Sequence, residues 1–97
     1  MKGEAMYYLL LYDVVDNFIE RRAVLRGAHL KLVQEAHERG ELWLAGALAD
    51  PVDGAALVFT TGDRSVVERF AQNDPYVMGG LVKAWRVRRW NVVVGGK

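Results

Sequence analysis

Residues 6–12 most constrain the fold, because this run is apolar on both of its alternating faces. In an extended strand, Tyr7, Leu9 and Leu11 project to one side, and the aromatic and aliphatic residues between them project to the other. Strands that are hydrophobic on both faces lie in sheets that are covered on both sides. The run is closed by Asp13 and is too short to span a bilayer, so it predicts a buried strand.

Two helical patterns and three further strand patterns follow this strand. From Phe18 to Arg39 the apolar residues recur at helical spacing, and Gly40 follows as a helix-terminating glycine. Pro75 ends the second helical pattern, because the residue before a proline avoids helical geometry. The sequence predicts a helix over 18–39, a strand over 42–45, a turn over 50–54, a strand over 55–61, a helix from 63 or 65 to 73, a strand over 81–94 and a frayed tail over 95–97.

The element order β-α-β-β-α-β predicts an α+β fold in a single domain spanning residues 1–97. Because crossover connections are right-handed, the economical arrangement is a ferredoxin-like sandwich. In this arrangement both helices cover one face of a four-stranded antiparallel sheet. The other face then remains open, although the first strand is apolar on that side as well.

The open sheet face predicts a protein partner. The hydrophobic share of 52% is high for a chain of 97 residues. Large exposed apolar patches mark interfaces, and two copies that stack sheet on sheet would bury this one. A two-fold homodimer is therefore expected.

Composition excludes several classes of protein and site. The chain has no cysteine, so disulfides, thiolate metal sites and cysteine nucleophiles are absent. Its two histidines are not spaced as a metal-binding pair, and no metal or cofactor is expected. A net charge of +1, from 13 basic and 12 acidic residues, gives no support for nucleic-acid binding. Basic residues do lie between Trp85 and Trp90, but the third predicted strand lacks the aromatic pattern of RNA-recognition sheets. No targeting or membrane segment is visible, so a cytoplasmic protein is expected.

His29 is the first residue that could carry chemistry. Helical spacing places Arg22, Arg26, His29 and Val33 on one face of the first helix. An imidazole beside the apolar stripe is suited to general acid–base chemistry at neutral pH. It is also explained by a histidine at the edge of the core, with the arginines extending to solvent.

Asp74 is the second such residue, and it lies between the second helical pattern and the glycine pair at 79–80. A carboxylate that holds a histidine in one tautomer is a common arrangement in small active sites. An Asp-Pro pair at a helix end also has a sufficient structural explanation, since it caps and turns the chain. In a ferredoxin-like fold the segment after the second helix can approach the first helix. We therefore expect His29, Asp74, Tyr12 and Tyr76 to meet at one pocket.

The chain resembles the YciI-like (YCII-related) family over nearly its whole length. The matching features are Arg26-x-x-His29-Leu30, Gly40 followed by a strand into Gly46, and Asp74-Pro75-Tyr76 with Gly79-Gly80 before the final strand. The resemblance implies a dimeric ferredoxin-like α/β-barrel fold, similar to muconolactone isomerases. It also implies a pocket with a histidine and an aspartate, matched here by His29 and Asp74. Ala47 stands where the family often has proline, and the link between the second and third strands is short.

These features lead to one functional hypothesis and one alternative. The hypothesis is a small enzyme, of isomerase or lyase type, that moves a proton on a compact organic acid or lactone. His29 would be the general base or acid, Asp74 would orient it, and Arg26 would pair with a substrate carboxylate. Tyr12, Tyr76 and Gly46 would complete the substrate-binding pocket. The alternative is a small-ligand-binding or accessory module without turnover.

Overall fold

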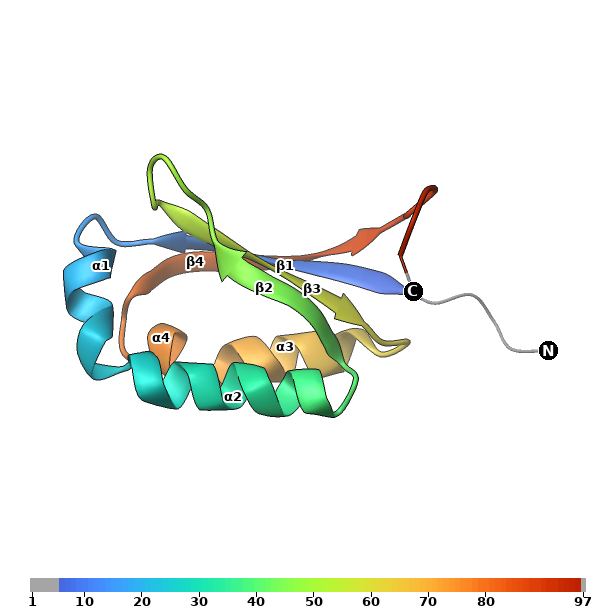
Figure 1. Cartoon of the computed structure of the whole chain (residues 1–97), viewed down its shortest axis with the longest axis horizontal. Coiled ribbons are helices and arrows are strands. Elements are labelled where there is room, and N and C mark those ends of the chain that lie inside the picture. Colours follow the sequence, from blue (N-terminus) through green and yellow to red (C-terminus); the bar gives the residue numbers. More distant parts are fainter. Residues whose placement is uncertain (1–5, 97) are drawn as a thin grey trace.

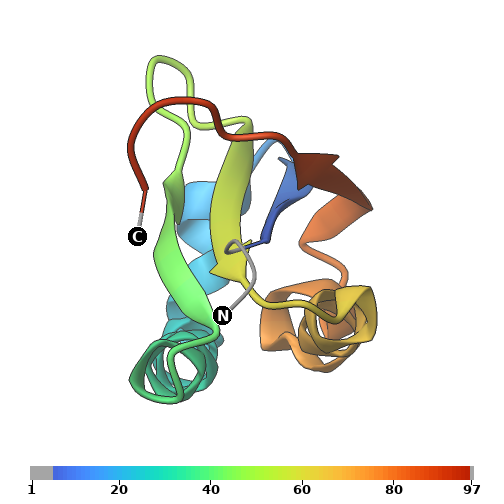
Figure 2. The ribbon, with the colours of Figure 1, turned by 90° about the vertical axis from the view of Figure 1, so that its right-hand side faces the viewer.

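A computed structural model describes residues 6–96 of the chain; residues 1–5, and Lys97 of the tail, lie outside the described part. Its elements are β1 (Tyr7–Val14), α1 (Phe18–Arg21), the 3₁₀ helix η1 (Arg22–Val24), α2 (Arg26–Glu38), β2 (Leu42–Ala47), β3 (Gly54–Thr60), α3 (Arg64–Asn73), α4 (Pro75–Met78) and β4 (Val82–Trp90). The four strands form one sheet in the order β2-β3-β1-β4, and all neighbours pair antiparallel. The helices lie together on one face of this sheet (Figures 1 and 2). The predicted ferredoxin-like α+β fold is confirmed.

β1 is the central strand that its two apolar faces predicted. It pairs with β3 on one side and β4 on the other, so that Leu10 stands opposite Leu57 and Val87. Leu10 is fully buried in the core between the sheet and the helices. Burying a leucine side chain contributes about 1.5–3 kcal/mol to folding, which explains why this strand takes the interior position.

The opposite face of the sheet is less well covered. Leu9 and Leu11 are half-buried there, and Leu44 and Trp90 are 56% and 43% exposed. β4 ends at Trp90 rather than at residue 94, and the segment that follows crosses the side of the sheet away from the helices (Figure 2). Gly96 lies against the ring of Tyr7. On β1 and β2 this face keeps the apolar surface that the sequence led us to expect, and on β4 it carries Arg88 and Arg86, opposite Leu9 and Leu11.

The helix predicted over residues 18–39 is interrupted. α1 and η1 precede α2, and α1 is turned away from the axis of α2 (Figure 1). Leu25 lies at the break, with φ −106° and ψ −7°, and its side chain packs against Gly79. The prediction of one continuous helix was wrong, and the break coincides with a contact between Leu25 and a residue that is distant in the sequence.

A β-bulge in β2 changes which of its residues face the helices. Leu42 stands opposite Phe59 and Leu44 opposite Val58, so Trp43 is an extra residue in the pairing. Leu42 is therefore buried under the helices, and Leu44 is on the open face. Simple alternation along a regular strand would place Leu42 and Leu44 on the same face, and the bulge puts them on opposite faces. Beyond the bulge, Ala45 and Ala47 pair with helix-facing residues of β3.

Gly79 and Gly27 allow a matched test of the helix break. An added Cβ at Gly79 would lie 2.5 Å from Leu25 Cδ1 and 2.9 Å from the Pro75 carbonyl oxygen, whereas one at Gly27 meets nothing within 4 Å. We expect Gly79→Ala to lower the free energy of unfolding by about 1–3 kcal/mol. Gly27→Ala should raise it by up to about 1 kcal/mol, because alanine favours the helix. Urea denaturation of both variants measures this, and equal stabilities would contradict the packing described here.

Candidate active site

Asp74 is the buried centre of the candidate site. Its side chain is 0% exposed and accepts three hydrogen bonds. The Tyr12 hydroxyl donates to Oδ2 at 2.7 Å, and the Tyr76 backbone N–H donates to Oδ1 at 3.0 Å. His29 Nδ1 lies 2.7 Å from the same Oδ1. His29 and Asp74, separated by 45 positions in the sequence, therefore meet in the fold as expected.

Local structure explains why the Asp74 side chain is held so firmly. Asp74 is both the C-cap residue of α3 and the N-cap residue of α4. Pro75 occupies the first turn of α4, where its fixed φ and missing N–H suit a helix start. The proline that follows α3 thus begins a further short helix, α4, which the sequence pattern did not predict. Asp74 therefore has both roles that its sequence context allowed, because the same carboxylate caps α4 and binds His29.

His29 is held by Asp74 on one side and by Tyr76 on its flat face. A carboxylate only accepts hydrogen bonds, so in the neutral form of the His29 ring the proton lies on Nδ1 and Nε2 carries the free lone pair. The ring stacks on Tyr76, with a centroid separation of 3.8 Å and an interplanar angle of 10°. Its side chain is 14% exposed, and it lines a cavity. No residue in the described part of the chain hydrogen-bonds to Nε2.

The two tyrosines of the site are neutral hydrogen-bond donors. Burial raises the pKa of Tyr12, and the charge of Asp74 and the hydrogen bond to it raise that pKa further. The phenol of Tyr12 therefore stays protonated and donates a hydrogen bond to Asp74. Burial also raises the pKa of Tyr76, although the guanidinium groups of Arg26 and Arg22 oppose the rise.

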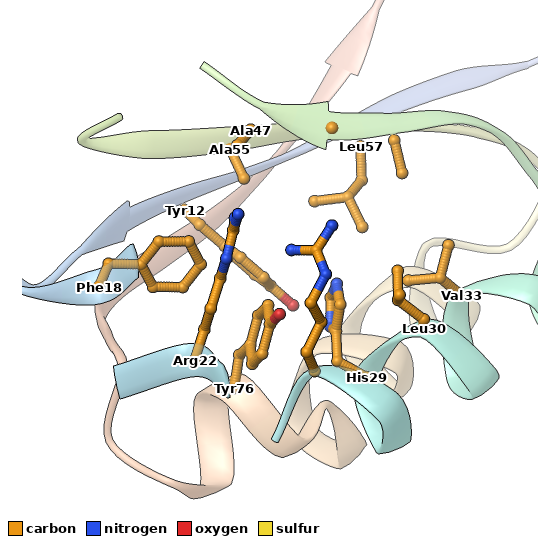
Figure 3. A pocket seen from close by; sticks show the side chains of 13 residues that line it. Tyr12, Phe18, Arg22, His29, Leu30, Val33, Ala47, Ala55, Leu57 and Tyr76 are labelled. Carbon is orange, nitrogen blue, oxygen red and sulfur yellow. The ribbon is translucent and has the colours of Figure 1, made fainter. Parts of the chain in front are cut away.

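The cavity has a volume of about 340 Å³ and lies between the helices and the sheet (Figure 3). Arg22, His29 and Tyr76 extend into it from the helical side, toward the sheet. The wall formed by the sheet is made mainly of small residues, because Ala47 and Ala55 pair at this position. The lining residues are Tyr12, Phe18, Arg22, Arg26, His29, Leu30, Val33, Ala45, Gly46, Ala47, Ala55, Leu57 and Tyr76.

Most of the predicted site residues meet at this cavity. Tyr12, Arg26, His29, Gly46 and Tyr76 all line it. Asp74 does not, because it lies behind His29 and Tyr12 and reaches the cavity only through them.

Some lining residues were missed as site residues. Arg22 was placed on the same helical face as His29, and this spacing was the signal that could have identified it. Phe18 and the small residues of β2 and β3 carried no such signal.

No group of three or more histidine, cysteine or acidic residues in the described part could hold a metal ion. No helix among residues 6–96 is long and apolar enough to cross a membrane.

The fold and the site together define a class of protein: an antiparallel ferredoxin-like domain with a buried aspartate and a histidine at a small cavity. A sequence model of the YCII-related domain matches residues 6–91. The chain belongs to the YCII-related domain family, as its sequence motifs indicated. No curated protein matches it significantly in sequence.

Solved structures share this fold. The 5-chloro-2-hydroxyhydroquinone dehydrochlorinase TftG from Burkholderia phenoliruptrix AC1100 aligns with a TM-score of 0.75 and 21% identity, over 89% of this chain and 94% of that chain. PA3566 from Pseudomonas aeruginosa aligns with a TM-score of 0.64 and 8% identity, over 97% and 99%. Atu4242 from Agrobacterium tumefaciens aligns with a TM-score of 0.59 and 11% identity, over 91% and 93%. At these identities the similarities establish the fold.

Proposed function

We propose that this chain is a small enzyme that moves a proton on a compact organic acid or lactone, with His29 as the general base or acid. One observation carries the proposal: His29 is bound to a fully buried carboxylate through Nδ1, while its other face lines a cavity. A histidine at the edge of the core would be satisfied by a backbone carbonyl and would not require a buried carboxylate. His37 is such a histidine, since its Nδ1 lies 2.9 Å from the Leu42 carbonyl oxygen.

The proposed chemistry follows from this arrangement. Nε2 of His29 takes a proton from the bound substrate, and the ring becomes an imidazolium. Asp74 stabilises that cation across the 2.7 Å contact and keeps the ring in position. The imidazolium then returns the proton to another atom of the substrate, which is isomerisation, or to a leaving group, which is elimination. Positioned acid–base catalysis of this kind contributes about 10²–10⁴ in rate.

The neighbour TftG supports the reaction class. Its name describes a dehydrochlorinase, and it was solved in complex with 2,5-dihydroxybenzoquinone. Loss of HCl from an organic molecule requires the removal of a proton, which is the step that we assign to His29. We propose that this chain carries out proton-transfer chemistry of the same kind, in the cytoplasm.

The first test is a ligand screen joined to a proton-exchange assay. Small carboxylates, lactones and hydroxyquinones are screened by thermal shift, since a ligand that binds the folded state raises the melting temperature. Compounds that bind are then incubated with the protein in D₂O, and NMR follows exchange of their carbon-bound hydrogens. We expect exchange or conversion with wild type. Binding without either would favour the non-catalytic ligand-binding module instead.

We also propose that the protein acts as a homodimer through the open sheet face. Leu9 lies at the centre of this face, opposite Val58 of β3. We expect wild type to have twice the mass of one chain in solution, and Leu9→Arg to be monomeric, because a charge in the centre of an apolar interface is costly. Val24→Arg is the control, since Val24 is 88% exposed on η1. Light scattering measures both, and a monomeric wild type would overturn the proposal.

A further inference from the structure

Two arginines at the cavity have no acidic partner. The ion pairs among residues 6–96 are His29–Asp74, Arg39–Glu41 and Arg64–Glu68, so neither Arg22 nor Arg26 is paired with a carboxylate. Both line the cavity. The Arg22 guanidinium lies 5.4 Å from the centre of the Phe18 ring, which holds it at the wall by a cation–π contact. Two unpaired positive charges thus border one cavity and repel each other unless an anion lies between them.

The Tyr76 hydroxyl is a buried donor without an acceptor. Among the described residues no acceptor lies within hydrogen-bonding distance of its proton, and the group that interacts with its oxygen is the Arg26 guanidinium, which is itself a donor. The ring cannot easily turn away, because it stacks on His29 and contacts Phe18 edge-on at 5.2 Å. A buried polar group without a partner is destabilising, so this hydroxyl is suited to a ligand. The charges of Arg26 and Arg22 lower the pKa of this hydroxyl, so both guanidinium groups lie near it. Burial raises the pKa by more, and the phenol therefore stays protonated as a donor.

The permanently charged side chains that line the cavity, Arg22 and Arg26, are both positive. Asp74, the carboxylate bound to the lining residues His29 and Tyr12, is buried behind them and already accepts three hydrogen bonds. Besides His29 and Tyr12, which bind Asp74, the polar side chains of the lining are two guanidinium groups and the Tyr76 hydroxyl, all of which can donate hydrogen bonds. Facing them across the cavity are Ala47, Ala55 and Leu57 (Figure 3), and the volume of about 340 Å³ is at the small end for ligand pockets. These dimensions suit a single flat ring.

We infer that Arg22, Arg26 and Tyr76 form an oxyanion-binding subsite, and that the cavity takes a one-ring organic anion with a carboxylate or enolate oxygen. The arginines hold the negative charge, and the Tyr76 hydroxyl donates a hydrogen bond to the same ligand. The assignment of this ligand as a substrate rests on the proposed function, but its binding does not. Arg22 and Tyr76 thereby become specificity-determining residues.

Matched pairs of charged and neutral probes test the subsite. Benzoate is compared with benzamide, and the enolate of 1,3-cyclohexanedione with neutral 3-methoxy-2-cyclohexenone, by titration calorimetry at pH 7 and low salt. We expect each anion to bind at least about tenfold more tightly than its neutral analogue, because charge-assisted hydrogen bonds exceed neutral ones. The two pairs also show whether a carboxylate or an enolate is preferred. Equal affinities within both pairs, or no binding of either anion at millimolar concentration, would overturn the inference.

Variants then assign the effect to residues. Arg22→Gln and Arg26→Gln should each weaken anion binding about tenfold, and Tyr76→Phe should weaken it severalfold while keeping the ring stack. Arg21→Gln, on the exposed side of α1, changes the charge equally and is the control. Thermal melts verify that each variant is folded. An equal loss in Arg21→Gln and Arg22→Gln would mean that net charge, and not this subsite, attracts the anion.

The outcome for the subsite can be separated from that for the proposed function. His29→Gln should retain the preference for anions, because it keeps both arginines and Tyr76. If His29→Gln also exchanges substrate protons as fast as wild type, the proposed function fails and the subsite stands. If exchange depends on His29 but anionic and neutral probes bind alike, the subsite fails and the proposed function stands.

Discussion

His29→Gln is expected to lower kcat by about two to four orders of magnitude on any substrate that the exchange assay identifies. Glutamine has a similar reach, and its amide can still donate a hydrogen bond to Asp74. It cannot take up and release a proton near neutral pH, so the chemical step is lost. Substrate binding through Arg22, Arg26 and Tyr76 remains, and the loss should therefore fall on kcat rather than on KM.

His37→Gln is the matched control for this variant. His37 is the other histidine of the chain, lies on the same helix α2, and contacts the Leu42 carbonyl oxygen instead of a carboxylate. Steady-state kinetics of both variants should show near-normal kcat for His37→Gln. Wild-type turnover by a folded His29→Gln variant would falsify the assignment of His29 as the general base or acid.

Asp74→Ala is expected to lower the free energy of unfolding by about 3–5 kcal/mol, a large share of the stability of a domain of this size. The substitution removes the cap of α4, and it leaves the Tyr12 hydroxyl and His29 Nδ1 buried without their acceptor. Urea denaturation with linear extrapolation measures the loss. A change below about 1 kcal/mol would mean that the hydrogen bonds to Asp74 are unimportant for the fold.

Asp74→Asn separates the structural role of this residue from its charge. The asparagine oxygen can take the place of Oδ1 and accept from both the Tyr76 N–H and His29 Nδ1, while its NH₂ group donates to the Tyr12 hydroxyl oxygen. We therefore expect Asp74→Asn to be much more stable than Asp74→Ala. Its kcat should still fall by about tenfold or more, because no negative charge stabilises the imidazolium. Full activity in Asp74→Asn would mean that the charge of Asp74 has no part in catalysis and that its role is structural.

Much of the fold could be predicted because the relevant signals are local. The two apolar faces of β1 predicted its central position, and the spacing of apolar residues predicted strands and helices in the correct order. The exceptions have causes outside the local sequence. The break at Leu25 accompanies packing against Gly79, and the bulge at Trp43 shifts the pairing of β2 with β3. Neither leaves a periodic signal.

The sequence predicted most residues of the candidate site, but it did not predict which of them line the cavity and which lie behind it. His29, Asp74 and the tyrosines were each identified from their local contexts, and the structure brings them into contact. That Asp74 lies behind the cavity while Arg22 lies on its wall was not predicted. This difference arises because α1 and η1 precede the break and α4 forms after Pro75, and both depend on how distant segments pack.

The sequence by itself determined the order of the elements, the faces that they bury and the residue types able to move a proton, because these depend on spacing along the chain. Only the tertiary structure decided that a carboxylate 45 positions from His29 fixes its ring, and that the resulting cavity is lined by unpaired arginines. Hydrogen bonds and cavity shape depend on distances through space, which require the packed sheet and helices to bring those segments together.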